Sequence, residues 1–565
     1  MSFFRNASLL SARGIPGYNF ASATLPYEKN PTNYASLVKG RGTAFAVEGF
    51  LYKLQLILKG ENKMAVEKLQ YFVNGQFKDS KTDVWYDLHN PSTGEVVGQA
   101  PCCTNDEVLE AIEAAKKAYP GWRATPAIKR AQILYKIREL IIRDMEELTM
   151  CVACENGKVW GEAEGDVLKA KEGTELATQV PSLMMGESLM DASSGYDTVK
   201  YREPLGVFAG IVPVNFPAMI PFGWMAPTCI ATGNTMVLKA ASLTPKTAMK
   251  FAAIYKEAGV PDGVINVITC SRNEVNTILD HPDVKGITFV GSTPVGLKVY
   301  SRAAAAGKRC QALTQAKNHA LVMSDCALER TVAGVINSAY GCAGQRCMAL
   351  TCCVVEEAIA DKFVAELVKQ AKNIKVGPSW EKTSKLGPIT YKKHYEEVLA
   401  DIQKGIDEGA ELVLDGRDVK VEGYENGYFI GPTIFDKVTA DMTIGDEEVF
   451  GPVLCIKRCK DFNEGLKIMN DNPYANGSVI YTQSGYFARQ FARYTDGGQV
   501  GINVGIPVPV GFFPFSGHKQ SFFGDLHCLG KDAYRFYTES KAVTQHWFDE
   551  EEKNTTSVST WDGTI

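Results

Sequence analysis

The sequence predicts an α/β protein whose central part is a doubly wound, mostly parallel sheet. Short and almost entirely apolar runs follow one another between residues 204 and 290, and helical segments separate them. Buried parallel strands have this continuous apolar composition, whereas strands with one wet face alternate between apolar and polar residues. The runs are PLGVFAGIVPV from Pro204, NTMVLK from Asn234, GVINVI from Gly263 and KGITFV from Lys285.

Folded patterning begins before this region. Residues 1–65 have the composition of an appendage, and YFVNGQF from Tyr71 carries Asn74-Gly75, a two-residue hairpin signal. Between Ala127 and Leu148, apolar residues recur at helical spacing with charged residues between them, which predicts one amphipathic helix. These elements form the start of a domain.

A further helix is predicted between the second and third apolar runs. Thr244 is a plausible N-cap, Pro245 suits the first turn, and Gly259 suits the C-terminal cap. Sheets in which strands and helices alternate in this way bind ligands at the carboxyl ends of their strands. A second α/β region is expected from about 318 to 530, and the polar segment from Asp549 is expected to be a disordered tail.

Composition narrows the class of function. The chain has 565 residues, a net charge of −5 and 45% apolar residues, and it contains no long basic run. This argues for a soluble protein of two or more domains that acts on small molecules, and against nucleic acid as a partner. No apolar run is long enough to span a membrane, and the fifteen cysteines lack the regular spacing of a disulfide scaffold, so we expect reduced thiols inside a cell.

Residues 1–27 contain Arg5 and Arg13, several serines and no acidic residue, which is typical of a mitochondrial presequence. We therefore expect the mitochondrial matrix as the location. A disordered tail, or an uncleaved extension through which residues 1–65 dock on a partner, remain alternatives.

The candidate chemistry rests on few residues. The segment GSTPVG at 291–296 follows a predicted strand and leads into a predicted helix. The N–H groups at the start of this helix could bind a phosphate, or the segment could be a strand-to-helix turn that binds no ligand. Cysteines 342, 347, 352 and 353 lack metal-site spacing and have no histidine nearby, so no metal site is expected. Cys347 is a candidate nucleophile because Arg346 and local N–H groups would favour its thiolate.

Ordered motifs along residues 70–548 resemble the aldehyde dehydrogenase superfamily. They are NPSTGEVVGQAP at 90, PLGVFAGIVPVNFPAMIP at 204, ATGNT at 231, FVGS at 289, AGQRC at 343 and EEVFGP at 447. Six segments resemble its CoA-acylating, methylmalonate-semialdehyde branch, namely SLMMGE at 182, FPAMIP at 216, AKNHA at 316, QRCMAL at 345, GYENGYFIGPTIF at 423 and NVGIPVP at 503.

The resemblance implies a domain plan. A dinucleotide-binding domain would comprise residues 66–188 and 204–316, and a catalytic domain residues 317–529. A bridging and oligomerisation element would comprise residues 189–203 and 530–548, followed by an acidic tail at 549–565. The family assembles as homodimers or homotetramers, and we expect the same here.

The resemblance also implies residue roles. Cys347 would be the nucleophile and Asn215 the side-chain donor of the oxyanion hole, while Arg346 and Lys169 would hold the substrate carboxylate. NAD would be the cofactor and coenzyme A the cosubstrate. The residues expected at the dinucleotide are Val212, Val214, Lys239, Ser242, Gly291, Ser292, Glu448 and Phe450.

Several positions depart from the family pattern. Leu313 replaces the glutamate with which the hydrolytic branch activates water, and a leucine accepts no proton, so a thiol such as that of CoA is expected to resolve the thioester. Ser242 and Leu243 replace a Glu-Arg pair that favours NAD over NADP. Gln315 replaces a glycine beside the nicotinamide, and Lys169 replaces an arginine, which removes a bidentate fork.

The sequence thus predicts CoA-dependent oxidation of malonate or methylmalonate semialdehyde to acetyl-CoA or propionyl-CoA through a thioester on Cys347. Two alternatives stay open. The departures would also suit a degenerate paralogue that serves as a structural subunit of a larger assembly, or an NADP-linked dehydrogenase of another aldehyde.

Overall fold

The computed structural model describes residues 66–193, 195–508, 510–548, 550 and 553. The described residues form one compact unit. The predicted targeting or docking extension at 1–65 and nearly all of the predicted tail at 549–565 lie outside the described residues. In the part of the chain that is described, no helix combines the length and the apolar character that crossing a membrane requires.

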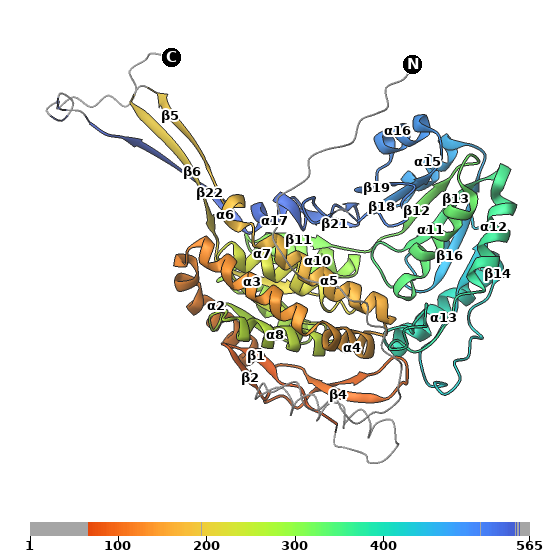
Figure 1. The fold of residues 1–565 in the computed structure, drawn as a ribbon, viewed down its shortest axis with the longest axis horizontal. Coiled ribbons are helices and arrows are strands. Elements are labelled where there is room, and N and C mark those ends of the chain that lie inside the picture. The colour runs from red at the N-terminus through yellow and green to blue at the C-terminus, as the bar shows by residue number, and fades with distance from the viewer. Residues whose placement is uncertain (1–65, 194, 509, 549, 551–552, 554–565) are drawn as a thin grey trace, which may run out of the picture. The chain divides into compact units, whose positions relative to one another are not determined.

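The first sheet has eight strands in the order β2-β1-β9-β8-β7-β10-β11-β21 (Figure 1). Its five middle strands, from β9 to β11, run parallel, and β1, β2 and β21 are antiparallel to their neighbours. The predicted apolar runs form β7, β8, β9 and β10. The strands are β1 (Tyr71–Val73), β2 (Gln76–Lys78), β7 (Val207–Ile211), β8 (Thr235–Lys239), β9 (Ile265–Ile268), β10 (Val284–Val290), β11 (Arg309–Leu313) and β21 (Phe522–Gly524).

Helices cover both faces of this sheet, which confirms the doubly wound prediction. Alternate residues of β7 belong to different cores: Val207 and Ala209 pack with the first group of helices, and Phe208 with the second. The first group is α2 (Asn105–Ala124), α9 (Arg272–Asp280) and α10 (Thr293–Ala305). The second group is α3 (Ala127–Arg143), α4 (Met145–Asn156), α5 (Trp160–Ala177), α6 (Val180–Leu183), η1 (Ile220–Met225), α7 (Ala226–Ala231) and α8 (Lys246–Ala258).

Local signals were read correctly at turns and less well at helix junctions. Asn74 and Gly75 both have positive φ, as the predicted β1–β2 hairpin requires. The helix predicted between Ala127 and Leu148 is instead two helices that meet at Asp144, whose φ of −100° and ψ of 14° break the helical path. This junction contains no Gly or Pro, and the apolar pattern continues across it. The sequence therefore contains no signal for the break between the two helices.

Helix α8 ends at Gly259 with φ of +89°, as predicted, but the predicted N-cap at Thr244 is wrong by one residue. Pro245 occupies the cap and offers no side-chain acceptor. Glu155 of α4 accepts from the N–H groups of Lys246 and Thr247 at 2.8 and 2.9 Å, so a carboxylate from another helix caps α8.

The second sheet has seven strands in the order β14-β15-β16-β13-β12-β18-β19, parallel except for β14, and it confirms the second α/β region. Its strands are β12 (Asn318–Val322), β13 (Leu350–Glu356), β14 (Glu411–Leu414), β15 (Thr433–Asp436), β16 (Val453–Cys459), β18 (Gly477–Tyr481) and β19 (Gln499–Ile502). Its helices are α11 (Leu328–Tyr340), α12 (Glu357–Ala371), α13 (Lys392–Asp407), α14 (Thr443–Asp446), α15 (Phe462–Asp471) and α16 (Gly485–Tyr494).

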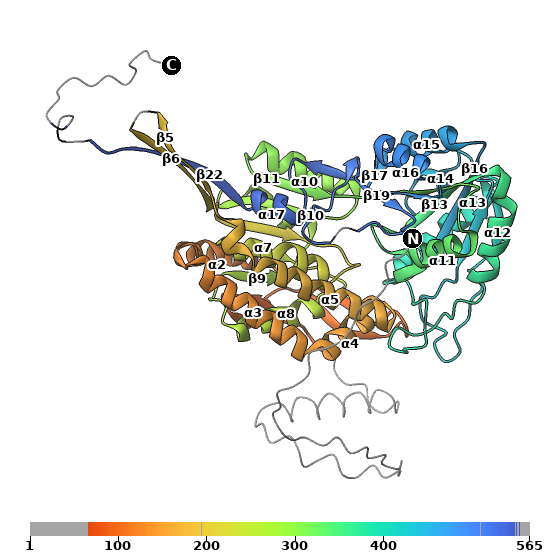
Figure 2. The same ribbon diagram turned by 45° about the horizontal axis from the view of Figure 1, so that its top comes forward.

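A three-stranded ribbon, β22-β6-β5, joins distant segments of the chain (Figure 2). Its strands are β5 (Glu187–Ser193), β6 (Tyr196–Pro204) and β22 (Thr538–His546), and α17 (Gly530–Phe536) precedes β22. Two small pairs complete the fold: β3 (Trp85–His89) with β4 (Val96–Pro101), and β17 (Tyr474–Ala475) with β20 (His518–Lys519). The domain boundaries given above stay predictions; β21, within the range assigned to the catalytic domain, pairs with β11 of the first sheet.

Candidate active site

Cys347 follows a tight turn between α11 and β13. The turn η2 (Gly341–Gly344) contains Cys342 and Ala343 with φ of 51° and 53°, and Gly344 continues it with φ of 72°. A Cβ on Gly344 would lie 1.9 Å from the carbonyl oxygen of Gly451, so only glycine fits there. Three successive left-handed residues turn the chain sharply just before the candidate nucleophile.

The backbone of Cys347 is held on its other side by amides. The side chains of Asn318 and Asn476 donate to the carbonyl oxygen of Cys347 at 2.9 and 3.1 Å, and Asn318 also donates to Ala349 at 2.8 Å. Asn318 begins β12 and Asn476 precedes β18, so two neighbouring strands fix the position of this cysteine. The position from which the half-buried side chain of Cys347 projects is therefore fixed.

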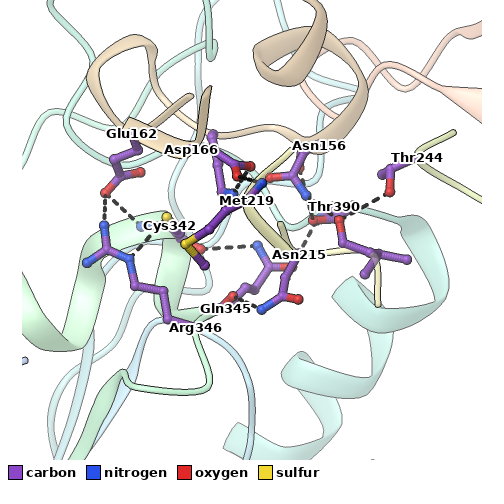
Figure 3. Close-up of polar contacts among 12 residues, drawn as sticks. Asn156, Glu162, Asp166, Asn215, Met219, Thr244, Cys342, Gln345, Arg346 and Thr390 are labelled. Atoms are coloured by element: carbon purple, nitrogen blue, oxygen red, sulfur yellow. Dashed lines mark hydrogen bonds and ion pairs between the residues drawn. The ribbon is translucent and has the colours of Figure 1, made fainter. Parts of the chain in front are cut away.

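Asn215 reaches the same turn from the end of β7. Its Nδ2 donates to the main-chain oxygen of Gln345 at 3.0 Å, as Figure 3 shows. An amide has two hydrogens, so the second remains for an oxyanion formed near Cys347. The Oδ1 atom of Asn215 is buried and has no hydrogen-bond partner among the described residues. Gln345 is fixed in turn, because its Oε1 accepts from the N–H of Thr390 at 3.1 Å.

Arg346, beside the candidate nucleophile, contacts two groups. Its Nη2 lies 3.1 Å from Oε1 of Glu162 and its Nε donates to the sulfur of Cys342 at 3.1 Å (Figure 3). Burial alone would lower the pKa of Arg346, but Cys342 and Glu162 outweigh it and the pKa is raised. The guanidinium therefore stays charged next to Cys347.

The thiol is protonated in this resting arrangement. Burial raises the pKa of Cys347 to about 12, the charge of Glu448 adds to the rise, and nearby N–H groups and Arg346 oppose it. Burial likewise raises the pKa of Glu448 to about 8. Cys342 is also protonated, since burial raises its pKa to about 11.

The carboxyl ends of β7, β8 and β10 form an edge suited to a dinucleotide. Successive strands β7, β8 and β9 lie to one side of this point, and β10 and β11 lie to the other, which is where doubly wound sheets bind ligands. Burial lowers the pKa of Lys239 at the end of β8, and its Nζ lies 3.4 Å from the hydroxyl of Ser242. The predicted dinucleotide residues that the structure brings to this edge are Val212, Val214, Lys239, Ser242, Gly291 and Ser292.

These residues fit a dinucleotide, although one backbone N–H at the start of α10 already donates a hydrogen bond within the protein. Ser292 is exposed at the N-cap of α10 and makes no capping hydrogen bond, so its hydroxyl is available to a phosphate. A Cβ on Gly296 would lie 2.3 Å from the Thr314 methyl, so helix and strand pack closely. The N–H of Thr293, however, donates to Oε1 of Gln315 at 3.0 Å.

Comparison with known proteins shows the family of this chain. The model of the aldehyde dehydrogenase family matches residues 77–543. The chain belongs to the aldehyde dehydrogenase family. Malonate-semialdehyde dehydrogenase 2 of Geobacillus kaustophilus (strain HTA426) is 47% identical over 483 residues, which are 85% of this chain and 99% of that protein.

Solved structures resemble this aldehyde dehydrogenase over most of its length. A putative methylmalonate-semialdehyde dehydrogenase from Sinorhizobium meliloti 1021, complexed with NAD, is 38% identical with a TM-score of 0.85, covering 86% of this chain and 99% of the other. Methylmalonate-semialdehyde dehydrogenase from Oceanimonas doudoroffii is 39% identical with a TM-score of 0.85, covering 86% and 100%.

Two residues of this aldehyde dehydrogenase that the resemblance placed at the site have other partners here. Lys169 on α5 is exposed and pairs with Glu172 at 2.6 Å, and the structure does not bring it into contact with Arg346. Phe450 has φ of 55°, and its carbonyl oxygen lies 2.8 Å from Nε2 of His394. Their roles in binding stay predictions.

Some residues that support the site were not identified from the sequence. Lys158 and Asp166 form a buried ion pair at 2.7 Å; Lys158 also lies over the Phe216 ring, and Asp166 accepts from the N–H of Met219 at 2.7 Å. The pair holds the loop that carries Asn215. Glu162 and Asp166 lie on α5, four residues apart, and this helical spacing was the available signal. No group of His, Cys, Asp or Glu in the described part of the chain is arranged to hold a metal ion.

Proposed function

We propose that this aldehyde dehydrogenase oxidises malonate semialdehyde or methylmalonate semialdehyde, with NAD as acceptor and coenzyme A as cosubstrate. The names of the relatives support the substrate, and the NAD-complexed neighbour supports the cofactor. The observation that carries CoA is Leu313, a buried residue at the end of β11 where hydrolytic members have a base. Leucine cannot activate water, so a thiol must complete the reaction.

The chain's own groups account for the first step. The Cys347 thiol first loses its proton to solvent, and the resulting thiolate adds to the aldehyde carbon. The carbonyl oxygen becomes an anion that Asn215 and the N–H of Cys347 stabilise. Arg346 attracts the substrate carboxylate. The nicotinamide of NAD, when bound, accepts a hydride from the substrate.

The remaining steps release the acyl group. Loss of hydride leaves a thioester on Cys347, and the CoA thiolate attacks its carbonyl carbon, so the acyl group passes to CoA and Cys347 leaves as a thiolate. The β-carboxylate then leaves as CO₂, and the enolate that remains takes a proton from solvent to give acetyl-CoA or propionyl-CoA. Deacylation therefore needs no base at position 313.

The test is NADH formation from malonate semialdehyde by wild-type protein and Cys347→Ala, with and without CoA, beside NAD and NADP titrations. CoA-dependent turnover that the variant lacks would support the proposal. Turnover with NADP alone would favour the NADP-linked alternative. A folded protein that neither turns over nor binds a dinucleotide would contradict the proposal and favour a structural subunit.

We also propose a homo-oligomer, either a dimer or a tetramer. In the described chain, β22 pairs only with β6 and β19 only with β18, so each offers an open edge. Val500 and Ile502 on β19 are 36% and 43% exposed and Val543 on β22 is 36% exposed. Light scattering of the purified protein would detect the assembly, and a monomer would contradict this.

Residues 1–65 are proposed to direct the protein to the mitochondrial matrix, on the basis of Arg5, Arg13 and the lack of acidic residues in 1–27. A fusion of residues 1–65 to a fluorescent protein should accumulate in mitochondria. A cytosolic fusion would leave docking of the extension as the remaining role.

A further inference from the structure

Glu162 links α5 to the turn that carries the nucleophile. A single carboxylate oxygen, Oε1, accepts from the N–H of Cys342 at 2.7 Å and from Nη2 of Arg346 at 3.1 Å. The side chains of Glu162 and Arg346 are each 18% exposed, so this contact is largely shielded from water. It therefore constrains the guanidinium more than a surface pair would.

The protein holds Arg346 by one edge. Nε faces the sulfur of Cys342 and Nη2 faces Glu162, and these two nitrogens form the side edge of the guanidinium. Nη1 has no hydrogen-bonding partner among the described residues. A Cβ at position 341 would lie 2.3 Å from Nη1, so Gly341 is what leaves room for this nitrogen. The end edge, Nη1 with the second hydrogen of Nη2, remains for an incoming carboxylate.

We propose that Glu162 is a positioning residue that fixes Arg346 so that its end edge receives the carboxylate of the substrate. The inference rests on the proposed function, in which that substrate is a semialdehyde bearing a carboxylate. Glu162 thereby contributes to selectivity for carboxylated aldehydes over uncharged ones. Its action is assigned to the acceptor oxygen, since one oxygen serves both donors, while the charge of Glu162 in addition raises the pKa of Arg346.

Glu162 could also weaken the binding of a carboxylated substrate. A carboxylate beside Arg346 repels an anionic substrate, and if repulsion dominated, removing Glu162 would strengthen carboxylate binding. The two effects predict opposite changes, so a single comparison separates them.

The experiment measures alkylation of Cys347 by iodoacetate and by iodoacetamide, two reagents of similar size of which only the first is charged. In both, the thiolate displaces iodide and forms a carbon–sulfur bond. Mass spectrometry of the peptide that contains Cys347 gives each rate, and the ratio is normalised to free cysteine. Docking on Arg346 should raise the ratio in the wild-type protein about 10-fold above free cysteine.

Three variants give the test its controls. Glu162→Met, which fills the space without an acceptor, should lose most of this preference, and Glu162→Gln, which keeps an acceptor oxygen, should retain it. Glu164→Gln, an exposed change on the same helix, should leave the ratio unchanged. If Glu162→Met does not fold, Cys342→Ala, which removes the partner of Nε, should still lower the ratio.

An unchanged or higher ratio in Glu162→Met would overturn the inference, as would a wild-type protein with no preference for iodoacetate. The assay uses neither NAD nor CoA. A protein that shows the preference but oxidises no semialdehyde would contradict the proposed function and leave the role of Glu162 intact. Turnover of semialdehyde with no effect of Glu162→Met on KM or on the alkylation ratio would do the reverse.

Discussion

The side-chain amide of Asn215 lies 3.0 Å from the main-chain oxygen of Gln345, two residues before Cys347. This contact joins the end of a strand in the first sheet to the turn before the candidate nucleophile, which precedes β13 of the second sheet. The amide is thereby oriented before any substrate arrives, and an oriented donor needs no reorganisation when charge develops.

Asn215→Ala should lower kcat about 10²–10³-fold, the usual loss for one oxyanion donor. The alkylation rate of Cys347 by iodoacetamide should not change, because Asn318 and Asn476 still hold its backbone. Steady-state kinetics and alkylation on the same sample check this. A kcat within threefold of wild type would show that Asn215 serves only to hold the turn.

The coupling of Cys347 to Glu448 predicts a pH-dependent difference. Glu448 raises the pKa of Cys347 only when it is ionised, and its own pKa is about 8. Glu448→Gln should therefore alkylate like wild type below about pH 7 and faster above about pH 9. Glu447→Gln, the exposed neighbour, is the control. Equal rates of Glu448→Gln and wild type at every pH would mean that the two groups do not interact.

Gln315 should weaken the grip on NAD. Its amide oxygen accepts from the N–H of Thr293 at 3.0 Å, and its side chain opposes the rise in the pKa of Glu448. Gln315→Gly frees both groups and should tighten NAD binding about 10-fold, the value of one hydrogen bond to a charged group. Calorimetric titration without substrate measures this, and weaker binding by the variant would show that Gln315 itself contacts the cofactor.

The adenosine end of the cofactor can be tested separately at Ser242. A carboxylate there would accept from ribose hydroxyls and repel a 2′-phosphate. Ser242→Glu should therefore raise the ratio of NADP to NAD dissociation constants, while Ser301→Ala, an exposed change in the C-terminal half of α10, should not. An unchanged ratio would place the 2′ position away from residue 242.

The buried pair of Lys158 and Asp166 should be essential for stability. Their side chains are 2% and 0% exposed, and burial already raises the pKa of Asp166. Lys158→Met leaves Asp166 uncompensated and should cost about 3–5 kcal/mol. Adding Asp166→Asn should recover part of this loss, because Asn can still accept from Met219. Urea unfolding midpoints compare the variants, and a double variant no more stable than the single one would show that the charge is not the cause.

The strands were predictable, and Cys347 could be proposed as the nucleophile, because their signals are local. Apolar runs specify β7 to β10, and Cys347 lies in a contiguous motif. Glu162, Asp166 and Asn476 were not predictable in the same way, since each acts on a loop more than 50 residues away. The cap of α8 failed for the same reason: Glu155 supplies it from 91 residues upstream. The helical spacing of Glu162 and Asp166 indicates that they share one face of a helix, but it does not indicate which distant loop they contact.

Strand β11 cannot pair with β21 until the ribosome has synthesised β21. The edge formed by Arg309–Leu313 waits for Phe522–Gly524, which leave the ribosome roughly 200 residues later. At 5–20 residues per second this interval is roughly 10–40 s. Through that time the nascent chain carries an open apolar strand edge, so association with a chaperone is most useful between translation of the two segments.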